Sequence, residues 1–315
     1  MSQATELPVS QAAPAGSDPR RRRRRRRFNP GYAFVALSTT YLLVFSLVPL
    51  VKGAQLSLTR TRLLNPDGGR FIGLDNYREL AGSGVGAAIG VTLLYTVLTV
   101  VGALTIGTAA ALVINRPFRG RALARALMTL PWAVPTVAVA LVFRWMYNDS
   151  YGVFNTIVGW FGLGQVGWLT DPDFGMLSVV VATVWKVSPF VMLIVLASLQ
   201  SVSDELYEAT RVDGADAIST FRMIVLPAIA PTLKVVALLM TIWSFRRFEI
   251  IWLLTGGGPA GTTNTMVIDI YREAFNNSDL GMAATLGVVG LGLSLVVTAV
   301  YFVAERRTAR QLQEA

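Results

Sequence analysis

The chain has 315 residues, of which 53% are hydrophobic and only 15% are charged, and its net charge is +9. Ordinary soluble domains have about 25% charged residues, so this composition favours a membrane protein over a soluble one. The chain contains no cysteine, no histidine and no Gly-x-x-x-x-Gly-Lys-Ser/Thr sequence, which excludes disulfides, Cys or His metal sites, Ser-His triads and an ATP-binding P-loop.

The N-terminal segment, residues 1–30, is expected to be a disordered, basic tail. It contains eight consecutive arginines, Arg20–Arg27. Because these arginines precede an apolar stretch, we interpret them as a topology anchor that contacts anionic membrane lipids, and not as a nucleic-acid site. The apolar stretch 32–51 is long enough to span a membrane, so we expect an uncleaved first helix instead of a signal peptide.

Apolar runs of about 20 residues or more, the length that crosses a hydrocarbon core of about 30 Å, recur along the chain. They predict an all-α, polytopic membrane protein with six transmembrane helices. The predicted spans are 32–51, 88–114, 126–147, 176–200, 228–254 and 284–304. The predicted organisation is therefore a tail over 1–30, a six-helix transmembrane domain over 31–304 with a loop at 201–227, and a second tail over 305–315.

The distribution of arginine and lysine predicts that both termini are cytoplasmic. The loop 148–175, on the opposite side, has three aspartates and no basic residue, whereas segment 52–87 does not follow the rule and holds five basic residues. The basic residues on the predicted cytoplasmic side, besides the N-terminal run, are Arg116, Arg119, Arg121, Arg125, Arg211, Arg222, Arg306, Arg307 and Arg310.

The predicted cytoplasmic loop before the fifth span has the pattern of two short helices. The first, 204–213, places Leu206, Ala209 and Val212 near one face, and Gly214 can adopt the left-handed conformation that ends it. The second, 216–226, presents Ile218, Phe221 and Val225 at helical spacing and precedes Pro227. Two apolar stripes at the membrane surface fit either a docking device for a partner or an interfacial helix that has no partner.

The same loop resembles the EAA signature of binding-protein-dependent ABC importer permeases. That signature has Glu-Ala-Ala, three residues, Gly, nine residues and Ile-x-Leu-Pro. Thr210 replaces the second alanine, a change between small residues. The matching positions are Glu208, Ala209, Gly214, Ile224, Leu226 and Pro227.

Further segments are similar to the carbohydrate subfamily, of the maltose and glycerol-3-phosphate type, and the resemblance covers roughly residues 31–304. They are Gly73-Leu74-Asp75-Asn76-Tyr77, Asp213-Gly214-Ala215, Trp185 with Pro189-Phe190, and Leu254-Thr255-Gly256-Gly257-Gly258-Pro259.

The resemblance implies a type I ABC importer permease fold in a bacterial plasma membrane, with transport by alternating access. It implies a second homologous permease subunit, two ATPase subunits and an extracytoplasmic sugar-binding protein as partners. ATP and Mg²⁺ would bind the ATPases, so this chain would hold no cofactor, no metal and no catalytic residue. The residues expected to couple to an ATPase are Glu208, Ala209, Asp213, Gly214, Ala215, Ile224, Leu226 and Pro227.

Polar and aromatic residues in the fourth and fifth spans are candidates for the substrate path, because sugars bind hydrogen-bonding groups and aromatic faces. Lys186 could line this path or pair structurally, and an arginine could pair with Glu249 or reach the surface. Two adjacent arginines in the fifth span suggest a phosphate-bearing substrate, because guanidinium groups suit phosphate. The adjacent Glu249 weakens this alternative, and an uncharged sugar is favoured. The candidates are Lys186, Trp243, Phe245, Arg246, Arg247, Phe248 and Glu249.

Three other functions compete with the sugar permease. A self-contained secondary transporter or channel would predict an inverted repeat and an intramembrane carboxylate, but no repeat is visible and only Glu249 qualifies. A membrane enzyme is disfavoured, because this chain has no histidine, no cysteine and no paired intramembrane carboxylates. A permease for glycerol-3-phosphate-like or other solutes remains an alternative.

Overall fold

A computed structural model describes residues 30–314 of the chain. The N-terminal tail with its arginine run therefore lies outside the described residues. The structure divides into two units, one ending at Pro49 and one beginning at Leu50, and every candidate functional residue lies in the second unit.

The described residues form an almost entirely helical fold, as predicted. Five helices are long and apolar enough to cross a membrane, and a sixth span results if one bent pair counts as a single crossing. The bent pair consists of α4, Arg121–Ala133, and α5, Thr136–Met146, which meet at 96°. The five long helices are α1, Pro30–Leu56; α3, Val85–Asn115; α7, Pro172–Leu199; α10, Leu226–Phe245; and α13, Leu280–Glu314.

Short elements connect the long helices. The strands β1, Thr59–Arg62, and β2, Asn65–Phe71, form an antiparallel hairpin that the sequence did not predict, with Thr59 opposite Phe71. Other connecting elements, besides those of the loop between α7 and α10, are α2, Asp75–Gly82; α6, Val153–Trp160; α11, Glu249–Leu254; α12, Met266–Tyr271; and η2, Arg272–Asn276.

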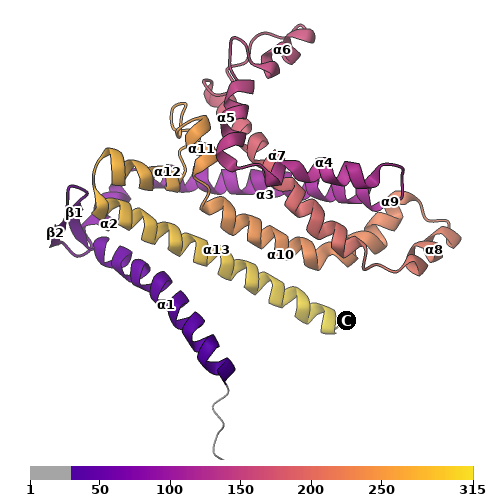
Figure 1. The fold of residues 1–315 in the computed structure, drawn as a ribbon, viewed down its shortest axis with the longest axis horizontal. Helices are drawn as coiled ribbons and strands as arrows, with labels where there is room; N and C mark the ends of the chain where they lie inside the picture. Colours follow the sequence, from indigo (N-terminus) through magenta and orange to yellow (C-terminus); the bar gives the residue numbers. More distant parts are fainter. Residues whose placement is uncertain (1–29, 315) are drawn as a thin grey trace, which may run out of the picture. The chain divides into compact units, whose positions relative to one another are not determined.

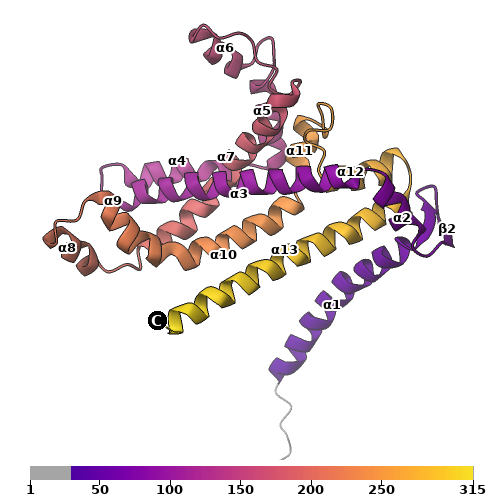
Figure 2. The same cartoon turned by 180° about the vertical axis from the view of Figure 1, so that it is seen from behind.

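Helix α7 is the centre of the packed core. In the most apolar segment of α7, 67% of the residues are buried, whereas in that of α13 only 6% are buried. Helix α7 packs most extensively against α3 (Figures 1 and 2). Glycines on α3 allow this approach: a Cβ at Gly107 would lie 2.5 Å from the Cβ of Val191 and 2.8 Å from the carbonyl oxygen of Ser188. The buried Tyr95 hydroxyl, 3.1 Å from Thr183 Oγ1, adds a polar contact between the same helices.

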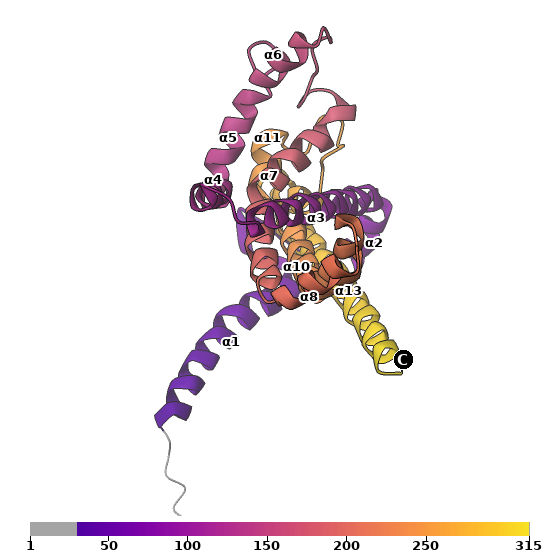
Figure 3. The ribbon, with the colours of Figure 1, turned by 90° about the vertical axis from the view of Figure 1, so that its right-hand side faces the viewer.

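Two predicted spans are broken, which corrects the prediction of continuous helices. The third predicted span bends after Ala133, where Pro131 and Pro135 lack the backbone N–H groups that a continuous helix requires. The fifth stops at Phe245, and α11 begins only at Glu249. Beyond the two breaks, α5 and α11 pack against each other (Figure 3). Both breaks therefore lie beside α7, which contacts the helices on each side of them.

Candidate functional site

The loop before α10 begins with helix α8, Asp204–Val212, close to the predicted range. Gly214 has a φ of +72°, as its expected role at the helix end requires. The amide of Ala215 donates a hydrogen bond of 2.9 Å to the carbonyl of Thr210, which closes the end of α8. The Thr210 side chain is buried and its hydroxyl donates to the carbonyl of Tyr207 at 2.9 Å. The departure from the family signature at this position is thus accommodated within the helix.

The second half of the loop differs from the prediction of a separate short helix. Asp216 caps α9, Ala217–Thr220, by accepting a hydrogen bond of 2.8 Å from the amide of Ser219. Hydrogen bonds from the Ser219 side chain and backbone hold the pKa of the Asp216 carboxyl below its ordinary value. From α9 the chain continues through the π-helical turn η1, Phe221–Val225, into α10. Pro227 falls in the first turn of α10, where its missing N–H costs no helical hydrogen bond.

The loop exposes some of its apolar side chains and buries others. Val212 is 87% exposed and Met223 is 70% exposed, and Leu206 and Ile218 are exposed as well. We call these four residues the exposed loop surface. In contrast, Phe221 packs against the chain's own core and Val225 is buried within it, so only part of the second predicted stripe is free. Met223 was not predicted as part of this surface.

The residues of the signature lie together around the loop. Glu208, Asp213 and Gly214 are exposed, and Ala215 is half-buried. Ile224 is half-buried, while Leu226 and Pro227 are exposed at the start of α10. Ala209 lies on α8. Carboxylates and apolar groups are thus exposed side by side with the signature residues of the loop.

Lys186 on α7 donates hydrogen bonds to the backbone at the break between α4 and α5. Its side chain is only 7% exposed, and its ammonium donates to the carbonyls of Val134 at 2.6 Å, Trp132 at 3.2 Å and Pro131 at 3.4 Å. These carbonyls lie at the break, and an ammonium group has three hydrogens to donate. This geometry supports the structural alternative for Lys186. Pro131 and Pro135 are the sequence signal that could have identified the acceptors.

Aromatic rings connect α4, α7 and α10 next to this lysine. Phe190, one turn after Lys186, lies 5.7 Å from Trp132 and 5.0 Å from Trp243, measured between ring centroids. Both tryptophans are partly exposed. We call these three residues the aromatic row. Its contact with Phe190 makes Trp132 the end of this row on α4.

The remaining path candidates are divided by the break between α10 and α11. Phe245 ends α10, Arg246 is exposed after it, and Arg247 is half-buried. Phe248 turns to a second aromatic cluster, with ring centroids 5.6 Å from Trp252 and 4.9 Å from Tyr271. The expected ion pair with Glu249 is not formed: the ion pairs between described residues all lie in or next to the hairpin and α2. The end of α10 separates groups that a continuous helix would have aligned.

Comparison with known proteins decides the family. The pattern of the binding-protein-dependent transport system inner membrane component family matches residues 103–310, which include the loop and both helix breaks. This chain belongs to that family. The resemblance predicted from the sequence is therefore confirmed, and the chain is a permease subunit.

Individual relatives of the permease cover most of its length. The trehalose/maltose transport system permease protein MalF of Thermococcus litoralis is 36% identical, over 86% of this chain and 92% of that protein. The sulfoquinovosyl glycerol transport system permease protein SmoG of Agrobacterium fabrum is 34% identical, over 84% of this chain and 86% of that protein. A bacterial alginate ABC transporter has been solved in complex with an alginate pentasaccharide-bound periplasmic protein. One of its chains matches with a TM-score of 0.78 and 25% identity, over 89% of this chain and 94% of that chain. The predicted type I importer fold is confirmed by this match.

The glycine-rich segment of the permease after α11 has a structural role. Gly256 and Gly257 have φ values of +59° and +92°. The guanidinium of Arg272 donates to the carbonyl of Gly256 at 2.7 Å and to Asn264 Oδ1 at 3.1 Å. These contacts connect the turn to the helical segment that follows α12. The segment that resembles the carbohydrate subfamily thus organises the backbone.

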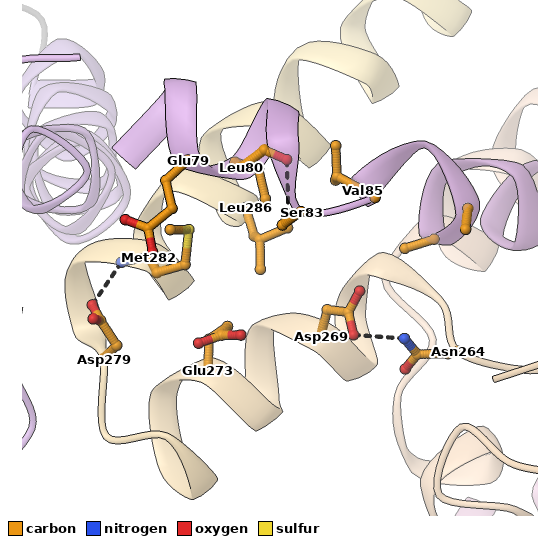
Figure 4. A pocket seen from close by; sticks show the side chains of 13 residues that line it. Glu79, Leu80, Ser83, Val85, Asn264, Asp269, Glu273, Asp279, Met282 and Leu286 are labelled. Atoms are coloured by element: carbon orange, nitrogen blue, oxygen red, sulfur yellow. Dashed lines mark hydrogen bonds between the residues drawn. The ribbon is translucent and has the colours of Figure 1, made fainter. Parts of the chain in front are cut away.

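A pocket of about 350 Å³ lies where α2 meets the start of α3, α12, η2 and the start of α13 (Figure 4). Four carboxylates line it, and three of them have partners. Asp269 accepts from the Asn264 amide at 2.6 Å, Asp279 accepts from the Met282 amide at 2.9 Å, and Glu79 lies 3.8 Å from Arg60. The fourth carboxylate is Glu273. Within residues 30–314, no group of three or more acidic side chains is arranged to hold a metal ion.

Proposed function

We propose that this permease is the transmembrane subunit of an ATP-driven, binding-protein-dependent sugar importer and forms half of its translocation pathway. The observation that carries the proposal is the similarity over most of the chain to proteins named for trehalose/maltose, sulfoquinovosyl glycerol and alginate transport. The partly exposed aromatic row supports a sugar, because its rings offer apolar faces to a sugar ring.

In this proposal the loop 201–227 couples the permease to an ATPase subunit. The exposed loop surface supports docking, since an exposed apolar patch at a helical loop marks a contact site. By family resemblance Glu208 lies near a basic residue of the ATPase. The permease itself is not an enzyme, and ATP and Mg²⁺ bind to the separate ATPase subunits.

The importer contains a second homologous permease and an extracytoplasmic sugar-binding protein. Both termini of this chain are cytoplasmic in a bacterial plasma membrane, which places the hairpin and the acidic pocket outside and the exposed loop surface inside. ATP binding and the loaded binding protein favour different conformations, and this difference drives alternating access.

The substrate path passes the helix breaks. Trp243 and Arg246 contribute exposed polar and aromatic surface at the end of α10, and Lys186 holds the α4–α5 break in place. Arg247, Phe245, Phe248 and Glu249 complete the set of candidates, with Phe248 belonging to the second aromatic cluster.

The proposal is tested by uptake into proteoliposomes that contain the complete importer. Internal ATP and the external cognate binding protein are supplied, and labelled maltose, trehalose, glucuronate oligosaccharides and amino acids are compared. Uptake of a sugar that requires both ATP and the binding protein supports the proposal. Uptake of amino acids alone, or sugar uptake by this chain without ATPase subunits, would contradict it.

A further inference from the structure

Two adjacent arginines follow the end of α10. The amides of Arg246 and Arg247 donate to the carbonyls of Trp243 at 3.3 Å and Ser244 at 3.2 Å, which closes the last helical turn. The carbonyl end of a helix attracts cations, so one positive charge is expected there. This attraction accounts for one positive charge but not for two. Neither guanidinium has a hydrogen-bond acceptor among the described residues. The Nε atom of Arg247 is buried without a partner.

The surroundings of these arginines add positive charge instead of cancelling it. Arg247 lies within electrostatic range of the Lys186 ammonium and of the Tyr95 hydroxyl. The three hydrogen bonds of Lys186 all go to uncharged carbonyls. Glu249 is the carboxylate nearest in sequence, and between the described residues it forms no ion pair with either arginine. Charges within a membrane span face a water-filled cavity or an opposite charge, and no described carboxylate forms an ion pair with Arg246 or Arg247.

An unpartnered hydroxyl lies one turn before Arg247. Ser244 is 3% exposed, and its Oγ atom has no hydrogen-bond partner among the described residues. A buried hydroxyl without a partner is costly. Like the Arg247 Nε atom, it is a buried polar atom for which the described residues supply no hydrogen-bond partner.

The aromatic row reaches the same helical turn. Trp243 is 36% exposed and stands three residues before Arg246, on the same side of the last turn of α10. Its ring lies beside Phe190, which continues the row to Trp132. An apolar ring surface next to a guanidinium suits a molecule that has both a sugar ring and an acidic group.

We propose that Arg246 and Arg247 bind the acidic group of an anionic sugar, a carboxylate, sulfonate or phosphate, while its ring lies along the aromatic row. This inference rests on the proposed function, since it names the substrate class of the same path. It reverses the sequence-based preference for an uncharged sugar, because Glu249 forms no ion pair with either arginine. Guanidinium groups bind such acidic groups through paired hydrogen bonds.

The natural absence of cysteine allows a direct test of the local charge. Trp243→Cys is introduced into the complete importer, and this chain is followed by intact mass spectrometry. The thiol reacts with 2-sulfonatoethyl methanethiosulfonate, an anion, or with 2-(trimethylammonio)ethyl methanethiosulfonate, a cation. Each rate is divided by the rate for free cysteine. We expect the anionic reagent to be favoured about tenfold, because clustered charge concentrates counterions.

Two controls locate the effect. Arg246→Gln with Arg247→Gln in the same chain should remove the preference for the anionic reagent. Trp160→Cys, on α6 and 78% exposed, should show no preference. Equal reaction of Trp243→Cys with both reagents would overturn the inference. This result is also expected if an acidic residue of the second permease neutralises the arginines in the assembled importer.

Protection then tests the ligand. Sodium glucuronate should slow the anionic reagent several-fold, whereas glucose at the same concentration and sodium chloride at the same ionic strength should not. No protection by glucuronate beyond that of sodium chloride, or equal protection by glucose, would overturn the anionic class. ATP-driven uptake of a neutral sugar by the importer with its native Trp243 would then leave the proposed function intact. If the importer with its native Trp243 showed no ATP-driven sugar uptake at all, the function itself would be refuted.

Discussion

The Nζ atom of Lys186 lies 2.6 Å from the carbonyl oxygen of Val134, although 52 residues separate them in the sequence. This contact joins α7 to the break between α4 and α5. Removing the ammonium leaves three carbonyls, whose hydrogen bonds to it are partly buried, without this donor, and each buried unsatisfied group costs about 1–3 kcal/mol.

Lys186→Met should therefore destabilise the permease by about 3 kcal/mol or more, since it keeps the length of the side chain but removes every donor. Thermal unfolding of the purified importer in mild detergent measures this effect. Lys234→Met is the matched control, because Lys234 lies on α10 and donates no hydrogen bond to a described residue. Equal melting temperatures for the two variants would contradict the structural role of Lys186.

Gly107→Ala should separate α3 from α7. The added Cβ would approach the Cβ of Val191 to 2.5 Å, and overpacking of this kind costs about 1–3 kcal/mol. Gly90→Ala on the same helix is the control, because no atom lies within 4 Å of its Cβ position. The melting temperature should fall only for Gly107→Ala. A similar change in both variants would show that the close helix contact is not required.

Asp216→Ala should loosen the start of α9. The carboxylate accepts the hydrogen bond of the Ser219 amide, and its lowered pKa means that the folded state favours the charged form. Its contribution to stability is thus complete above the ordinary pKa of 3.8 and is lost as the pH falls through the lower folded value. Hydrogen exchange at pH 7 should show faster exchange of the Ser219 amide in Asp216→Ala but not in Asp213→Ala. Unchanged exchange would exclude the cap.

Much of the fold could be predicted from the sequence, because the apolar runs and the loop signature are local features. Gly214 ends α8 as predicted, and α8 itself has nearly the predicted bounds. The end of α10 at Phe245 could not be predicted, because neither proline nor glycine follows directly. There the last turn closes through the amides of Arg246 and Arg247, which donate to the carbonyls of Trp243 and Ser244.

The functional residues divide in the same way. The position of Lys186 could be predicted, but not its acceptors, since they belong to a helix break more than 50 residues earlier. The second apolar stripe of the loop was predicted to be free as a whole. Phe221 and Val225 instead contact the core formed by α3, α7 and α10. The spacing of apolar residues does not show whether a stripe packs against a partner or against the chain's own core.

The central claim is that the exposed loop surface binds an ATPase subunit, and co-purification tests it most directly. Val212→Glu places a charge on this surface, and Leu64→Glu, at a residue that is 91% exposed in the hairpin, is the matched control. Both positions are exposed, so neither change should unfold the permease. Retention of the ATPase by the affinity-tagged permease pair in mild detergent is then quantified. The account predicts that Val212→Glu loses most of the ATPase while Leu64→Glu keeps it, and equal retention by the two variants would contradict it.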